Sequence, residues 1–154
     1  MCSISTIVSV VSAISSVAAA GVSWYKEIKL SQQLKLNKFN DELNEIVKDI
    51  DTYLELCRQY WMVAGLSQDE RTLRASEITY KGKNISSSLT IINKKYKTLL
   101  NRDIVDYIRD FNEIKSKATG GTFQTQMFRL DRDCVIQVQD LVASFRENIK
   151  NERK

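Results

Sequence analysis

The chain contains no proline in 154 residues, and this absence constrains its fold more than any other feature. Proline breaks helices and marks turns, so a chain without it favours long, uninterrupted helices over a turn-rich β architecture. Apolar residues also recur every three or four positions over most of the sequence, which is the spacing of one face of a helix. We therefore expect an all-α fold.

Four apolar stripes mark the helices expected after residue 25. Gly65 can end the first helix in the left-handed conformation, and Ser67 with Glu70 has the spacing of a capping box that starts the second. Gly82 and the serines that follow weaken helix propensity, so we expect a kink or short loop at residues 81–84. Asn101 or Asp103 can cap the third helix. The stripes run from Leu36 to Ala64, Ala75 to Leu99, Ile104 to Ile114 and Met127 to Ile149, and together they predict a bundle of about four helices.

The first 25 residues carry no charged side chain. As a helix they would extend over about 37 Å, which exceeds a hydrocarbon core of about 30 Å. Trp24 and Tyr25 lie where an interfacial aromatic belt is expected, and the first four lysines follow at positions 26, 29, 35 and 38. The uncharged length predicts a transmembrane helix at residues 1–25, and the positive-inside rule predicts that its N-terminus lies outside and that residues 26–154 form a cytosolic helical domain.

A cleaved signal peptide and a buried core helix are the two alternatives for this segment. A cleaved signal peptide would end near Ala18 to Gly21, but it should begin with basic residues, and the first one here is Lys26. A buried core helix seldom continues for about 25 residues without a charge. Both fit less well than a membrane anchor.

Small residues form a single stripe along the expected span. The stripe consists of Ser5, Ser9, Ser12, Ser16, Ala19 and Ser23, at spacings of 4, 3, 4, 3 and 4. Small residues let helices approach closely in a bilayer, and hydroxyls can bond between them, so the stripe predicts a homo-oligomer and could line a polar path. Alternatively, the serines return their hydroxyls to the backbone of their own helix.

The chemistry of an enzyme is largely excluded by composition. The chain has no histidine, which removes imidazole-based triads, zinc sites and pH switches. Three cysteines cannot form an all-thiolate metal site, and Cys57 and Cys134 fall on apolar stripes, where a buried thiol is the ordinary interpretation. We expect neither enzymatic activity, nor a metal, nor a cofactor.

Two segments carry candidate ligand-binding residues. The first places an aromatic ring, two ammonium groups and an amide together, a set that can stack on a base and offset phosphate charge. The second is a glycine pair expected at the start of the last helix, where free N–H groups and the helix dipole favour anions. A solvated kink and a solvated loop are the ordinary alternatives, and a net charge of +4 does not favour duplex nucleic acid. The candidates are Tyr80, Lys81, Lys83 and Asn84 in the first segment, and Gly120, Gly121, Thr122 and Arg129 in the second.

The layout of one N-out span, a lysine-rich exit at residues 26–38 and a small helical domain resembles a known family. It is similar to the cyclic-tetra-adenylate-activated membrane effectors found with type III CRISPR antiviral systems. The resemblance implies a homo-oligomeric antiviral effector in the bacterial inner membrane that binds a cyclic oligoadenylate in its cytosolic domain and perturbs the lipid bilayer. It rests on layout alone, so no residue is carried over.

Two alternatives use the same features. A membrane-anchored adaptor would dock a protein partner on its helices and bind no small ligand. A holin-like protein would act through the span itself, with the helical domain as a regulator.

Overall fold

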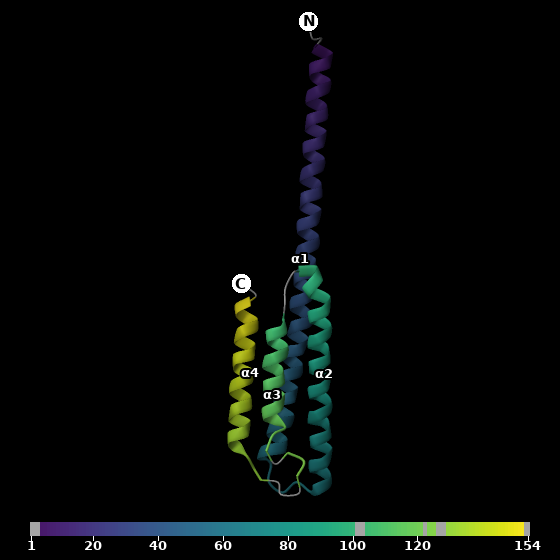
Figure 1. Cartoon of the computed structure of the whole chain (residues 1–154). Coiled ribbons are helices and arrows are strands. Elements are labelled where there is room, and N and C mark those ends of the chain that lie inside the picture. Colours follow the sequence, from purple (N-terminus) through teal and green to yellow (C-terminus); the bar gives the residue numbers. More distant parts are fainter. Residues whose placement is uncertain (1–3, 101–103, 122, 126–128, 153–154) are drawn as a thin grey trace. The chain divides into compact units, whose positions relative to one another are not determined.

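A computed structural model describes residues 4–100, 104–121, 123–125 and 129–152, with side chains from residue 20 onward except at 100 and 152. Its elements are α1 (Ile4–Met62), α2 (Gln68–Leu100), α3 (Val105–Ala118) and α4 (Arg132–Glu152) (Figure 1). The described residues contain no strand. The predicted all-α fold with four helices is confirmed.

The chain divides into two compact units, one up to Lys38 and one from Phe39 onward. In the first unit every described side chain from residue 20 to 35 is exposed. Of the helices, none is long and apolar enough, within the described residues, to cross a membrane. The structure thus gives no support to the predicted span at residues 1–25. The side chains of residues 1–19 lie outside the described part, and with them all of the predicted association stripe except the exposed Ser23.

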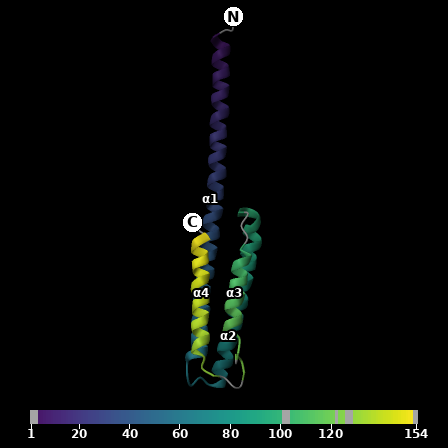
Figure 2. The ribbon, with the colours of Figure 1, turned by 60° about the vertical axis from the view of Figure 1, so that its left-hand side comes forward.

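The second unit is an antiparallel bundle. The end of α1, the start of α2 and the connection from α3 to α4 lie at one end of it in both views (Figures 1 and 2). Helix α3 packs against α2 and α4. Ion pairs join α1 to α2, where Lys81 Nζ lies 2.6 Å from Asp49 Oδ1, and join α1 to α4 between Asp51 and Arg146.

The core of the bundle follows the predicted stripes. The first predicted stripe is buried from Phe39 to Tyr60 of α1, whereas Leu36 is partly exposed and Ala64, which lies beyond the end of α1, is exposed. Burying side chains of this size contributes about 1.5–3 kcal/mol each, so the stripes account for the assembly of the bundle. Aromatic rings from different helices meet edge to face: Phe39 with Tyr96 at 4.9 Å, Tyr53 with Phe111 at 5.7 Å, and Tyr107 with Phe145 at 5.8 Å between centroids.

The start of α2 has the predicted capping box. The backbone N–H of Ser67 donates to Glu70 Oε2 at 2.8 Å, and the N–H of Glu70 donates to Ser67 Oγ at 3.3 Å. Gly65 has a φ of +85°, the left-handed conformation expected after α1. Both predictions are confirmed.

The short loop predicted as one alternative at residues 81–84 is wrong, because α2 continues without interruption through these positions. Gly82 serves close packing instead. A Cβ atom there would lie 3.2 Å from the ring of Tyr53 and 3.4 Å from the Lys115 stem. The glycine therefore lets α2 approach α1 and α3 closely.

The last helix begins later than predicted. The stripe of apolar residues suggests a start near Met127, which lies outside the described residues, but α4 begins at Arg132. Asp131 Oδ1 accepts the N–H of Cys134 at 2.8 Å, which caps the helix at this point and leaves Leu130 51% exposed. The predicted caps Asn101 and Asp103 of the third helix lie outside the described part of the chain.

Candidate functional site: a pocket between α2 and α3

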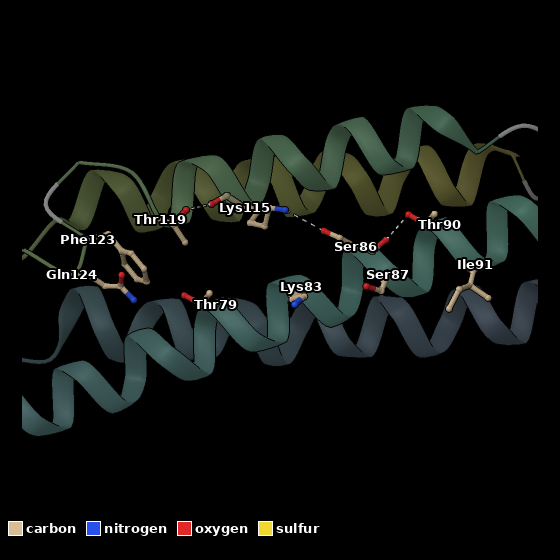
Figure 3. Close-up of a pocket in the computed structure, with 10 residues that line it drawn as sticks. All are labelled: Thr79, Lys83, Ser86, Ser87, Thr90, Ile91, Lys115, Thr119, Phe123 and Gln124. Atoms are coloured by element: carbon tan, nitrogen blue, oxygen red, sulfur yellow. Dashed lines mark hydrogen bonds between the residues drawn. The ribbon is translucent and has the colours of Figure 1, made fainter.

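A pocket of about 770 Å³ lies between α2 and α3, next to the turn that follows α3 (Figure 3). Its volume falls within the range of about 300–1,000 Å³ that is typical of sites for small molecules. The lining residues are Thr79, Lys83, Ser86, Ser87, Thr90 and Ile91 from α2, Lys115 from α3, and Thr119, Phe123 and Gln124 after α3.

One polar face of α2 forms a wall of this pocket. Thr79, Lys83, Ser86 and Thr90 follow each other at spacings of 4, 3 and 4, so they share one side of the helix. The neighbouring stripe of the same helix, from Ala75 to Tyr96, is buried in the core. Core packing therefore fixes the direction in which the polar face points.

The charge of the pocket is positive. Lys83 reaches it from α2 and Lys115 from α3, and none of the described residues that line it is acidic. Lys115 Nζ donates to Ser86 Oγ at 3.3 Å, which holds one ammonium group against the opposite wall (Figure 3). Two ammonium groups without a carboxylate suit an anionic ligand.

Three threonine hydroxyls add acceptors to the pocket. Each hydroxyl donates its proton to a carbonyl oxygen of the preceding helical turn, so the oxygen lone pairs remain to accept hydrogen bonds. Such oxygens suit the O–H or N–H donors of a ligand, as in a sugar. The bonds run from Thr79 to Ala75 at 2.8 Å, from Thr90 to Ser86 at 2.8 Å and from Thr119 to Lys115 at 2.9 Å.

The turn after α3 supplies an aromatic ring and an amide. The Phe123 ring packs against Tyr60 and Trp61 of α1, with centroids 4.9 and 6.2 Å apart. Gln124 has a φ of +59°, a conformation that residues other than glycine seldom adopt. Its N–H donates to the hydroxyl oxygen of Tyr60 at 2.9 Å, which holds the turn against the end of α1.

A smaller pocket of about 300 Å³ adjoins the same turn. Gln124 lines both pockets. The smaller one is otherwise lined by Tyr60, Gln68, Arg71, Thr72, Ala75 and Thr125, so most of its side chains carry hydrogen-bonding groups.

Of the four candidates predicted on α2, one, Lys83, lines the larger pocket. Lys81 is instead paired with Asp49, and Tyr80 is 69% exposed. Asn84 is exposed and lines neither of the two pockets.

The predicted glycine pair lies at the end of α3 and not at the start of the last helix. Gly120 and Gly121 follow the end of α3, whereas α4 begins only at Arg132, so the prediction that they open the last helix is wrong. Gly120 N–H donates to the carbonyl of Lys117 at 3.4 Å, and Gly121 takes a φ of +62°. The pair thus ends a helix, where the dipole favours cations. Arg129 is exposed, and Thr122 lies outside the described residues.

Sequence reasoning missed most of this pocket. Hydroxyl residues recur at helical spacing on both sides of Lys83, but the sequence pattern marks the serines only as weak helix formers. Lys115 comes from another helix, and Phe123 and Gln124 follow a glycine pair. Nothing in a single sequence indicates that these residues meet α2.

The buried thiols lie apart from this pocket. Cys57 and Cys134 are both buried, as predicted, and burial raises the pKa of Cys57 to about 12. The Cys134 thiol donates to the carbonyl oxygen of Lys117 at 3.4 Å. In the described part of the chain no cluster of acidic or cysteine side chains could hold a metal ion.

No protein-family model matches the chain, and neither a curated protein nor a solved structure matches it.

Proposed function

We propose that the helical domain binds a small anionic ligand in the pocket between α2 and α3, and that the protein is a ligand-gated membrane effector. One observation carries the proposal. Lys83 and Lys115 reach a pocket of ligand size from two helices, and no acidic side chain among the described lining residues opposes them. Several hydroxyl groups in the same pocket suit a ligand that carries both negative charge and hydrogen-bond donors.

A cyclic oligoadenylate is the ligand class to test first. The resemblance in layout suggests cyclic tetra-adenylate, and its phosphates, ribose hydroxyls and bases match the ammonium, hydroxyl and aromatic groups around this pocket. A homo-oligomer would bring several copies of the two lysines to one symmetric ligand. A net charge of only +4 per chain is then sufficient for binding an anionic ligand.

Membrane attachment is proposed from the sequence. Residues 1–25 are uncharged and four lysines follow by position 38, which favours an anchor in the bacterial inner membrane with the N-terminus outside. The small-residue stripe from Ser5 to Ser23 would join the anchors of an oligomer. Ligand binding could perturb the bilayer only if the ligand has different affinities for two states of the protein.

Leakage of a dye from liposomes tests the function. Full-length protein reconstituted in vesicles should release the dye on addition of cyclic tetra-adenylate, and replacing Lys83 and Lys115 by methionine should abolish release. The control replaces Lys48 and Lys150, which are exposed on α1 and α4 and line neither pocket. Ligand-independent leakage, or leakage equal in both double variants, would contradict the proposal.

A further inference from the structure

We propose that the two pockets form one bipartite site for a phosphate ligand that carries a nucleobase. The phosphate would lie between Lys83 and Lys115, and the base would lie against the turn at Phe123 and Gln124, with its edge in the smaller pocket. The inference rests on the proposed function and specifies which part of the ligand each group recognises.

The larger pocket has chemically different regions along its length. Phe123 and Gln124 lie at the end next to the turn, whereas Lys115 and Ser86 approach each other farther along the two helices (Figure 3). Thr79 and Thr119 lie between these regions. From the turn, the order is aromatic and amide groups, then hydroxyls, then ammonium, and Ser87, Thr90 and Ile91 lie beyond the lysines. The first three regions match the order of base, sugar and phosphate in a nucleotide.

Phe123 can act as a stacking surface. Its ring is half-buried, because it packs on Tyr60 and Trp61 while also lining the pocket. Stacking of a base on an aromatic side chain is worth about 1–3 kcal/mol and does not require a particular base. The aromatic cluster behind the ring keeps it in place, which lowers the entropic cost of binding.

The smaller pocket can recognise the edge of the base. Gln68 and Gln124 bring amides to it, and Thr72 brings a hydroxyl. A glutamine amide can donate and accept at the same time, which is the pairing that an adenine edge offers. Gln124 lines both pockets, so it stands where a stacked base would pass from one to the other.

The positive φ of Gln124 is an independent sign that this position is constrained. A left-handed conformation is unfavourable for a glutamine and persists where the surrounding structure holds it. Here the bond to Tyr60 holds it, at 2.9 Å. The strain falls at the junction of the two pockets, where the proposal places the base.

Calorimetric titration of the full-length protein in detergent tests the inference with adenosine 5′-monophosphate, ribose 5-phosphate and inorganic phosphate as probes. We expect the nucleotide to bind at least about tenfold more tightly than ribose 5-phosphate, since only the nucleotide can stack. Phe123→Leu should remove most of this difference while leaving ribose 5-phosphate binding unchanged. Lys83→Met should weaken the binding of all three probes.

A second variant covers the risk that Phe123→Leu disturbs the aromatic cluster. Gln68 is exposed on the first turn of α2, so Gln68→Leu should leave folding intact and reduce the preference for adenosine over uridine monophosphate. Equal affinities for nucleotide and sugar phosphate in the unmodified protein would overturn the inference while leaving anion binding intact. If neither these probes nor cyclic tetra-adenylate binds, the proposed function fails, and this inference fails with it.

Discussion

The backbone N–H of Gln124 donates to the hydroxyl oxygen of Tyr60 at 2.9 Å, although Gln124 has a left-handed φ of +59°. The bond joins the turn after α3 to the last turn of α1. Glycine would adopt this conformation without strain, whereas a glutamine keeps it only where the surrounding structure holds it. That side chain lines both pockets.

Replacing Gln124 by glycine should raise the stability of the protein and weaken its binding of nucleotide. The strain of a left-handed residue disappears, so we expect the free energy of unfolding to rise by about 1 kcal/mol. Loss of the amide should at the same time weaken nucleotide binding. Urea unfolding and calorimetric titration measure the two effects. Gln124→Ala is the matched control, because it removes the amide and keeps the strain. A glycine variant that binds nucleotide as tightly as the unmodified protein would exclude a role for the side chain.

Replacing Gly82 by alanine should destabilise the bundle. Alanine favours a helix by about 1 kcal/mol over glycine, but the new Cβ would lie 3.2 Å from the buried Tyr53 ring, which packs against Phe111. Overpacking typically costs about 1–3 kcal/mol, so we expect a net loss of about 1 kcal/mol in thermal or urea unfolding. Asn84→Ala, on the exposed face of the same helix, should be neutral or stabilising. A more stable Gly82→Ala variant would show that the contact relaxes freely.

The capping box at the start of α2 should make stability depend on pH in acid. The backbone N–H and the hydroxyl of Ser67 hold the pKa of Glu70 below its ordinary value of 4.5. A lowered pKa in the folded state means that this stabilisation is fully present above about pH 4.5 and is lost as the pH falls through the folded-state value. The melting temperature of Glu70→Gln should therefore approach that of the unmodified protein in acid. A constant difference at all pH values would contradict this assignment.

The buried thiols should be chemically inert in the folded protein. Burial raises the pKa of both Cys57 and Cys134, so little thiolate is present at neutral pH. In a Cys2→Ser background we expect no reaction with a thiol reagent under native conditions and reaction of both cysteines in denaturant, measured by absorbance. Rapid labelling of either thiol in the folded protein would contradict the described burial.

The bundle was predictable because its apolar residues keep helical spacing. The stripe in α1 predicted its buried residues, and Gly65 with Ser67 and Glu70 predicted the junction between α1 and α2. These features are local, since each depends on residues within one or two helical turns. The prediction failed at Gly82, where the reason for glycine is a ring that comes from another helix.

The candidate pocket could be predicted only in part. The sequence pattern predicted Lys83, which lines the pocket, but Lys81 is paired with Asp49, and Tyr80 is exposed and lines neither pocket. Lys115 joins the pocket only through the packing of α3 on α2. A single sequence shows which residues share a helix face, and it does not show which faces meet.

Binding of cyclic tetra-adenylate to the full-length protein, measured by calorimetric titration, tests the central claim most directly. We expect saturable binding that is lost when Lys83 and Lys115 are both replaced by methionine, and that is retained when the exposed Lys48 and Lys150 are replaced instead. Equal affinity in the two double variants, or no binding by the folded unmodified protein, would contradict the assignment of this pocket.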